Sequence, residues 1–381
     1  MVSAENWPAW RGPQANGVAP GGNPPTEFSE EKNIQWKIKV PGSGSSTPVI
    51  WEDQVFILTA VETGKKVATP EGGSSADRGG RSSQRGSRPE GRQRGGQRGG
   101  ERSERGGRES RGGFGGGFNR EDMIKRFDKD GDGELNEAER NALRDELRRQ
   151  FSRNRGGERG SRGGRSGRSR GGFGGGRKPT EEFRFVLISY DRNSGKENWR
   201  SVATTAVPHE GHHRDHGYAS ASPVTDGENI IVSFGSRGLY CFDMKGKVQW
   251  KKNFGNMRTR NSFGEGSSPA LHGNTIVLLW DQEDDSHIYA LDKKTGKVKW
   301  KRERDEATGW CTPLVISHDG ITQVLVNGAT AVRSYQLSDG KLLWQCGGQT
   351  VSAIPSIVAD KNTAYAMSGF RGAYVAAIKL G

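Results

Sequence analysis

The sequence predicts an all-β fold, a β-propeller of four-stranded blades, because two signals repeat along the chain. In the first signal an Asp opens a turn, a Gly-Lys pair closes it and a Trp follows in the next strand. Four copies of this cassette end at Trp199, Trp250, Trp300 and Trp344. In the second signal a Ser/Thr-Pro pair begins a short apolar strand, where Pro removes no interior ladder bond. These pairs are Thr47-Pro48, Ser222-Pro223, Ser268-Pro269 and Thr312-Pro313, with Ile354-Pro355 in the fifth place.

Each repeat holds four predicted strands in roughly 40 to 50 residues, the period of a propeller blade. The clearest copy runs from His287 to Trp300 and is a strand, a tight turn from Asp292 to Gly296, and a second strand. About five blades are expected, and residues 354–380 supply three strands of the fifth. The chain then ends without a further Trp strand, so either Trp36 closes a five-bladed ring or the sequence is truncated.

The N-terminal part divides at residue 32. Residues 1–32 are rich in Trp, Pro and Gly, and we expect an irregular arm that packs on the propeller through its aromatic side chains. Residues 33–64 begin the propeller: 33–40 alternate in polarity around Trp36 and predict a strand that completes the last blade. The first blade then begins at Thr47-Pro48, breaks off and resumes within 181–381.

An insert of unusual composition separates these parts. Residues 65–180 carry 30 Lys and Arg against 17 Asp and Glu, whereas the rest of the chain carries 28 of each, so the insert holds the whole net charge of +13. Its flanks, 65–118 and 152–180, are Arg/Gly-rich and lack the apolar residues for a core, which predicts disordered tethers. Residues 119–151 predict a small helical unit, an EF-hand.

The EF-hand prediction rests on a loop that satisfies the calcium-binding pattern at every position. Its oxygen ligands are expected from Asp128, Asp130, Asp132, Glu134 (through its backbone carbonyl), Asn136 and Glu139. Gly133 permits the sharp turn, and Glu139 would supply two oxygens. Calcium is therefore the expected cofactor, and the alternative is an acidic turn between two helices.

A histidine-rich segment offers a second candidate metal site, at His209, His212, His213 and His216. It contains the His-Glu-x-x-His pattern of zinc proteases, which requires both His on one helical face. Pro208, Gly211 and Gly217 argue against a helix, so we expect a loop between blades. The alternatives are a loop metal site and a polar loop on a propeller face.

Three further features limit the function. Cys241, Cys311 and Cys346 form no Cys-x-x-Cys motif; Cys241 in a predicted strand suggests a buried free thiol, with one disulfide as the alternative. No run of about 18 apolar residues predicts a transmembrane helix. Val2-Ser3-Ala4 has the form of a signal-cleavage site, so we expect a periplasmic or extracellular protein whose signal peptide is missing from this sequence. The Arg-Gly tracts would then be solvated tethers or adhere to an acidic polymer, and nucleic acid is not the expected partner.

The Asp…Gly-Lys-x-x-Trp cassette resembles the repeat of pyrroloquinoline-quinone (PQQ)-type propellers, a family that includes quinoprotein dehydrogenases and a non-enzymatic outer-membrane assembly lipoprotein. The segments at Trp7–Gln14, Tyr218–Pro223 and Gly264–Pro269 are similar to a group of exported bacterial PQQ-like proteins. The resemblance implies that the Trp turns dock blades on one another. It also implies further blades beyond Gly381.

We therefore expect a non-enzymatic exported scaffold that binds a protein or envelope partner on a propeller face and carries a calcium-binding insert. The alternative is a PQQ-dependent or metal-dependent oxidoreductase on the same propeller. The quinoprotein dehydrogenases carry an adjacent cysteine pair near the cofactor, which this sequence lacks, so PQQ is not an expected cofactor.

Overall fold

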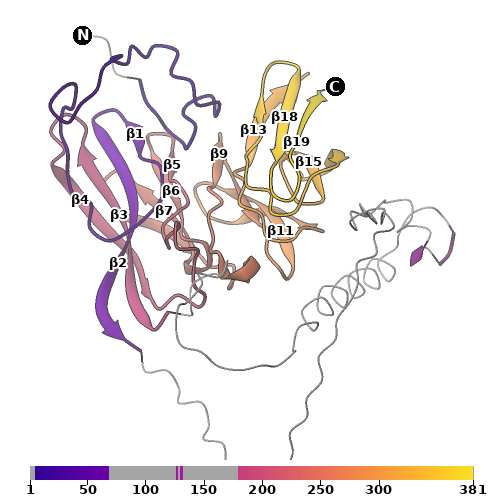
Figure 1. The fold of residues 1–381 in the computed structure, drawn as a ribbon, viewed down its shortest axis with the longest axis horizontal. Helices are drawn as coiled ribbons and strands as arrows, with labels where there is room; N and C mark the ends of the chain where they lie inside the picture. Colours follow the sequence, from indigo (N-terminus) through magenta and orange to yellow (C-terminus); the bar gives the residue numbers. More distant parts are fainter. Residues whose placement is uncertain (1–4, 68–125, 128, 132–178, 381) are drawn as a thin grey trace, which may run out of the picture. The chain divides into compact units, whose positions relative to one another are not determined.

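A computed structural model describes residues 5–67, 126–127, 129–131 and 179–380. Its contacts divide the chain into two compact units: Met1–Ser74 with Gly171–Gly381, and Ser75–Arg170. The first unit contains all the strands of the described residues (Figure 1). The predicted EF-hand falls almost entirely outside the described residues, and the predicted domain boundaries stay a prediction.

In the described residues the strands form four four-stranded sheets and one three-stranded sheet, all antiparallel, which confirms the predicted fold class of four-stranded blades. Blade A contains β1 (Val49–Trp51), β2 (Gln54–Lys66), β3 (Glu181–Asp191) and β4 (Glu197–Ala206). Blade B contains β5 (Val224–Thr225), β6 (Asn229–Ser233), β7 (Leu239–Asp243) and β8 (Val248–Lys252). Blade C contains β9 (Ala270–His272), β10 (Thr275–Trp280), β11 (Ser286–Asp292) and β12 (Val298–Arg304).

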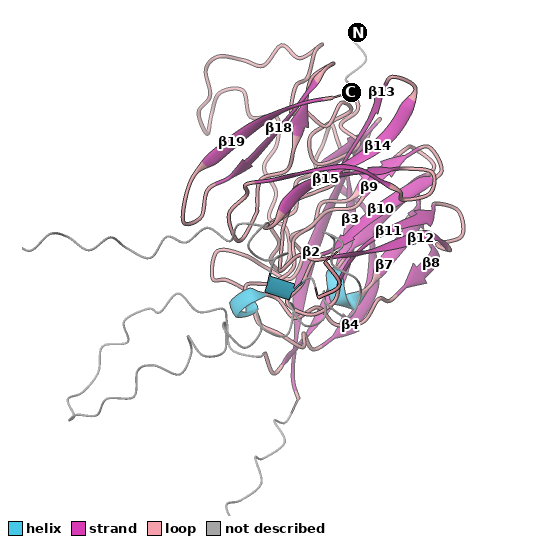
Figure 2. Cartoon of the chain, turned by 90° about the vertical axis from the view of Figure 1, so that its right-hand side faces the viewer, coloured by secondary structure: helices cyan, strands magenta, loops and turns pink. Residues whose placement is uncertain are grey.

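Blade D contains β13 (Leu314–His318), β14 (Ile321–Val326), β15 (Ala331–Gln336) and β16 (Leu342–Gly347), and blade E contains β17 (Val358–Ala359), β18 (Thr363–Ser368) and β19 (Tyr374–Lys379). Figure 2 shows the sheets following one another in chain order, from β18 and β19 at one side to β7 and β8 at the other. Because the strands alternate in direction, the segments between blades and the β2–β3-type hairpins lie at one end of every blade. We call this end the loop face.

The hydrophobic core lies between successive blades. One cluster joins Phe56 and Phe185 of blade A to Ile230 and Phe242 of blade B, and all four side chains are buried. Equivalent clusters join B to C, C to D, and D to E. Blades A to D therefore bury both faces, which explains the apolar inner runs of β3, β10 and β14, whereas blade E leaves Tyr374 and Val375 exposed.

The Trp cassette joins each blade to the next. Trp300 of blade C donates its indole N–H to the Leu337 carbonyl of blade D at 2.8 Å, and its ring covers Gly340. Gly340 has φ +74°, and a Cβ there would lie 2.6 Å from the ring, so the turn requires Gly. Trp250 and Trp199 occupy the same place on Gly296 and Gly246, as expected for blade docking.

Trp36 takes the equivalent place on blade A, although the predicted strand around it is wrong. Residues 33–40 form no strand in the structure. The Trp36 indole nevertheless donates to the Arg192 carbonyl at 2.8 Å, and its ring covers Gly195. The side-chain contact is therefore kept without ladder bonds from the surrounding backbone.

The Ser/Thr-Pro pairs form a chain of hydrogen bonds across the inner strands. The Thr47 amide donates to Ser222 Oγ at 2.9 Å and the Ser222 amide donates to Ser268 Oγ at 2.8 Å. The Ser268 amide donates to Thr312 Oγ1 at 3.3 Å, and the Thr312 amide donates to Ser356 Oγ at 2.7 Å. The fifth position is therefore Ser356. The predicted marker Ile354-Pro355 begins two residues too early, because Pro355 precedes the linking hydroxyl instead of following it.

Candidate binding platform on the loop face

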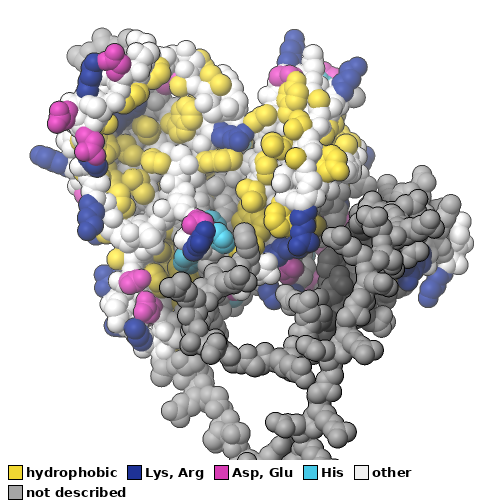
Figure 3. Space-filling view, in the orientation of Figure 1, with side chains coloured by type: hydrophobic (Ala, Val, Ile, Leu, Met, Phe, Trp, Pro, Cys, Tyr) yellow, Lys and Arg dark blue, Asp and Glu magenta, His cyan; other side chains and the backbone are white. Residues whose placement is uncertain are grey.

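Three successive segments between blades interlock on the loop face, and we call residues 209–216, 257–266 and 306–310 the loop platform. The first segment, between β4 and β5, contains the predicted histidines and is a loop, as expected. Figure 3 shows histidine side chains beside acidic and basic neighbours on this part of the surface.

Glu210 fixes the first segment to the second. Its carboxylate accepts the Thr259 amide at 3.1 Å and the Thr259 hydroxyl at 3.0 Å. His209 Nε2 donates to the Met257 carbonyl at 2.6 Å, and the His213 amide donates to the Phe263 carbonyl at 3.0 Å. The Glu of the apparent protease motif is thus a partner of backbone and hydroxyl donors.

The second segment is fixed to the third by two further bonds. The Arg260 amide donates to Thr308 Oγ1 at 2.9 Å, and the Trp310 indole donates to the Gly264 carbonyl at 2.8 Å. Thr308 Oγ1 in turn donates to Glu283 at 2.9 Å, which ties the platform to the β10–β11 hairpin. These bonds come from three separate blades, so the platform moves only if several of them break together.

The apex of the second segment is strained. Asn261 and Ser262 have φ values of 52° and 53°, in the left-handed region that residues other than Gly rarely adopt. Each such residue costs about 1–3 kcal/mol and persists only where its surroundings hold it. Arg260 and Phe263 flank this apex and are partly exposed, as is Trp310 beside them.

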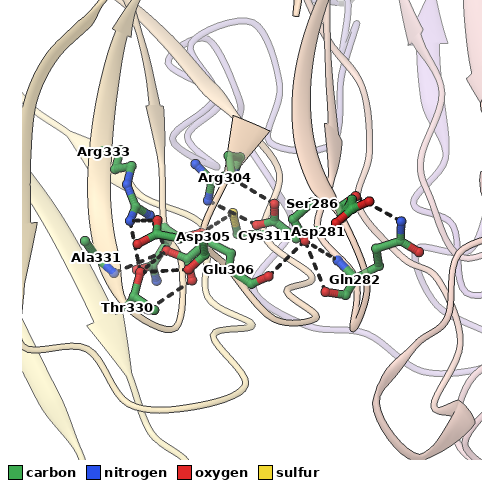
Figure 4. A network of polar contacts seen from close by, with 12 residues as sticks. Asp281, Gln282, Ser286, Arg304, Asp305, Glu306, Cys311, Thr330, Ala331 and Arg333 are labelled. Atoms are coloured by element: carbon green, nitrogen blue, oxygen red, sulfur yellow. Dashed lines mark hydrogen bonds and ion pairs between the residues drawn. The ribbon is translucent and has the colours of Figure 1, made fainter. Parts of the chain in front are cut away.

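A buried ion-pair network underlies the third segment (Figure 4). Arg304 holds Asp281 with two parallel bonds of 2.8 and 3.1 Å, and both side chains are fully buried. Arg333 pairs with Glu306, and the Glu306 carboxylate also accepts the Thr330 amide at 2.9 Å. Removing one partner of such a pair typically costs about 3–5 kcal/mol, because the other charge stays buried.

Burial determines the titration of the groups around the platform. It raises the pKa of Asp281 to about 6, against the opposing effect of Arg304. It lowers the pKa of His216, and the neighbouring His212 and His213 lower it further. It also raises the pKa of the Cys311 thiol to about 12, so this thiol is protonated at neutral pH and is a weak nucleophile.

The predicted histidines meet hydrogen-bond partners in this loop. His212 Nδ1 donates to the His213 carbonyl at 2.7 Å, and His216 Nδ1 contacts Ser220 Oγ at 2.7 Å. Across the described residues, no group of three or more His, Cys, Asp or Glu side chains could hold a metal ion. The histidine metal site stays a prediction.

Other sequence predictions fare differently. Of the EF-hand ligands only Asp130 is described, where it is exposed, and Asp128, Asp132, Glu134, Asn136 and Glu139 lie outside the described residues. The three cysteines are free thiols, which confirms the buried thiol at Cys241. Within the described parts of the chain, no helical segment has the length and apolar content needed to cross a membrane.

Two spaces lie among the described blades. The enclosed space beside Asp281 and Glu265 is about 20 Å³, room for one water. In a larger inner cavity, Asp226 and Glu228 form ion pairs with Lys293.

Sequence reasoning found the first platform segment but missed Thr259, Thr308 and Trp310. A loop Thr gives no periodic signal, and its partner comes from another blade. The one usable signal was Trp310, which lies outside the cassette that places the other blade tryptophans.

Comparison with known proteins places the chain in a family. The family described as "Outer membrane protein assembly factor BamB" matches residues 184–379. No curated relative matches the chain.

Three solved structures are similar to the chain. BamB from Moraxella catarrhalis is 17% identical, with a TM-score of 0.34, over 52% of this chain and 54% of that one. A europium-containing methanol dehydrogenase is 11% identical, with a TM-score of 0.33, over 44% and 40%. The quinohemoprotein alcohol dehydrogenase from Comamonas testosteroni is 12% identical, with a TM-score of 0.36, over 49% and 38%. The chain spans about half the length of these proteins or less. Its four-stranded blades, its Trp–Gly docking and the family match agree: the chain belongs to the BamB-type family of PQQ-like repeats.

Proposed function

We propose that this chain is a non-enzymatic exported scaffold that binds a protein partner through the loop platform. The strained apex at Asn261 and Ser262 carries this proposal, because strain held by surrounding bonds clusters at ligand-binding sites. Arg260 and Trp310 belong to the residue types that dominate protein interfaces. The bonds from three blades hold them in place before a partner arrives, which lowers the entropy lost on binding.

The test compares two charge reversals in the full chain. Arg260→Glu changes the platform, whereas Lys341→Glu changes an exposed turn at the opposite end of blade D. Immobilised parent and variants are exposed to envelope extract, and bound proteins are quantified by mass spectrometry. A partner held by the parent and by Lys341→Glu but lost by Arg260→Glu supports the proposal. Equal capture by all three chains contradicts it.

An oxidoreductase is the competing function, and quinone titration separates the two. Absorbance would report stoichiometric PQQ binding, and a dye-coupled assay would report turnover. Stoichiometric binding together with turnover would end the scaffold proposal. The raised pKa of the Cys311 thiol, which makes this buried group a weak nucleophile, supports the non-enzymatic function.

The proposal includes a calcium-binding insert at Asp128, Asp130, Asp132, Glu134, Asn136 and Glu139. Six oxygen donors at EF-hand spacing support it. Gly131, within the same loop, has φ +74°, which suits a tight turn. Calorimetry of the full chain with calcium tests it, and no binding heat at millimolar calcium would contradict it.

We also propose a periplasmic or extracellular location and an acidic polymer as a ligand of the Arg/Gly-rich residues 65–118 and 152–180. The family description, which names an outer-membrane assembly factor, supports the location. The excess of basic residues supports the polymer. Cell fractionation tests the first, and heparin affinity of the parent against a chain without these residues tests the second.

A further inference from the structure

A cavity of about 610 Å³ lies on the inner side of the blades, away from the loop platform. The arm residues Pro8–Ala15 line it together with the starts of the inner strands of blades B, C and D. Figure 3 shows apolar side chains on both sides of a hollow in the upper part of the view. No platform residue lines the cavity, and its volume is within the range of ligand-binding pockets.

The arm shows how the inner strands bind an extended chain. Trp7 exchanges two backbone hydrogen bonds with Ile50 of blade A, at 2.8 and 2.9 Å. The Thr225 amide of blade B donates to the Pro8 carbonyl at 2.9 Å. Ile50 and Thr225 occupy one repeat position, three residues after the linking Ser or Thr. Consecutive arm residues thus pair with the same position of consecutive blades.

The same position in the next two blades is Leu271 and then Val315, and both line the cavity. His272 pairs with Thr275 across a two-residue turn, so this closing pair is hydrogen-bonded. Hydrogen-bonded and non-bonded pairs alternate in an antiparallel ladder, so the Leu271 amide and carbonyl point away from β10 into the cavity.

Val315 has the same orientation. The closing pair of its hairpin is His318 with Ile321, and Val315 lies three positions further along β13, again in a non-bonded pair. The arm bonds to neither residue, because beyond Pro8 its amides donate to carbonyls within the arm itself: Gly12 donates to Ala9 and Gly17 donates to Arg11. Two backbone positions equivalent to those that hold the arm therefore face the cavity.

The residues that line the cavity indicate which side chains a ligand would carry. They are largely apolar, with Ala270, Leu314 and Ile357 among them. Two cations line the cavity: Lys293, which Asp226 and Glu228 neutralise, and Arg11, which lies over the Trp10 ring. A chain with apolar side chains suits these walls, whereas a highly charged polymer does not.

We propose that the cavity binds an extended apolar peptide segment of a partner protein, paired through its backbone with Leu271 and Val315 as a continuation of the arm. This is β-strand addition, in which main-chain bonds give affinity and pockets for alternate side chains give specificity. The site is separate from the loop platform, so either proposal can fail alone.

The probe is a labelled, end-capped peptide of alternating Thr and Val, and its control is the same peptide N-methylated at alternate amides. We expect fluorescence anisotropy to show binding of the probe to the full chain and at least tenfold weaker binding of the control. Hydrogen exchange should slow at the Leu271 and Val315 amides when the probe is added. Equal binding of both peptides, no binding at all, or unchanged exchange at both amides would overturn the proposal.

Two variants locate the site. Leu271→Pro removes the inward amide without removing a ladder bond, and we expect it to weaken the probe at least tenfold. Ser317→Pro removes an inward amide of the same kind outside the cavity and should leave binding unchanged. If Leu271→Pro fails to fold, the exchange measurement on the parent still decides.

Arg260→Glu should leave the probe's affinity unchanged, which separates this site from the platform. Self-association that dilution reverses, with probe binding only to the diluted chain, would assign the cavity to a second copy and overturn the proposal.

Discussion

Ser268 links two blades, because its hydroxyl accepts the Ser222 amide at 2.8 Å while both residues are buried. Each residue stands immediately before the Pro that precedes its own inner strand. Pro has no amide hydrogen, so the backbone N–H of the preceding residue is the nearest donor that can reach the next blade. The Ser/Thr-Pro pair, which marks the start of an inner strand in the sequence, therefore also forms the hydrogen bond between neighbouring blades.

We expect Ser268→Ala to destabilise the protein by about 1–3 kcal/mol, because it leaves the buried Ser222 amide without an acceptor. Denaturant unfolding measures the change. Ser338→Ala, which removes an exposed hydroxyl that accepts a bond from Gln336, is the control and should stay within about 0.5 kcal/mol of the parent. Similar midpoints for the two variants would show that the link contributes nothing.

Trp300→Ala should be more damaging, at about 3–5 kcal/mol, because it empties the space over Gly340 and removes the bond to Leu337. Val298→Ala, on the same strand and 38% exposed, is the matched control. Thermal and denaturant unfolding of both variants test this. If Trp300→Ala melts at the parent temperature, the indole does not hold the blades together.

The repeats made the fold predictable because each carries its own docking contacts. Asp292, Gly296 and Trp300 recur with fixed spacing, and the spacing alone identifies turn and strand. The strand expected around Trp36 was wrong because alternation predicts which side chains are buried and does not supply a pairing strand. The fifth marker was displaced because Pro355 follows Ile354 and no Pro follows Ser356.

The contribution of His216 to stability should fall in mildly acidic solution. Burial lowers the pKa of His216, so the unfolded chain binds a proton more readily than the folded chain. The contribution is present above the unfolded pKa of about 6.5 and is lost as the pH falls through the folded value. His216→Gln should make the free energy of unfolding depend less on pH in this range, as measured by urea titrations. The exposed His272→Gln serves as control, and equal pH dependence in parent and His216→Gln would contradict the assignment.

Calcium binding should depend most on Glu139, the expected bidentate ligand. Glu139→Gln removes its charge and should weaken calcium binding by about tenfold or more in calorimetry of the full chain. Glu137→Gln, which changes an acid outside the ligand positions, is the control. The unfolding temperature of the propeller should not respond to calcium. A large calcium-dependent shift would show that the insert docks on the blades.

Removing residues 68–178 should leave the propeller folded. The β2–β3 ladder continues to the pair Lys66 and Glu181, and the Val67 amide donates to the Thr180 carbonyl at 2.8 Å, so a short Gly turn can join the ends. Stability should stay equal or rise, because each halving of loop length lowers the closure cost by about 0.6 kcal/mol. Circular dichroism during thermal unfolding measures this. A deletion variant without a cooperative transition would mean that the blades need the insert.

The sites were less predictable than the fold because their partners come from different blades. Glu210 looked like part of a metalloprotease motif, and only the structure shows Thr259 as its partner. The inner cavity gave no sequence signal, since Leu271 and Val315 resemble any strand residues. Their significance comes from the inward direction of their amides, which requires the register of each hairpin.

The arm has a consequence for the order of folding. It precedes every blade in the sequence, yet Ala9 packs against the cluster between blades B and C, and Ala15 packs against the cluster that contains Leu314 and Ile357. These contacts join residues more than about 200 positions apart, and such long-range contacts slow folding. Trp7 and Pro8 can therefore pair with Ile50 and Thr225 once blades A and B have formed, whereas Ala15 reaches its place only after the blades that carry Leu314 and Ile357 have formed.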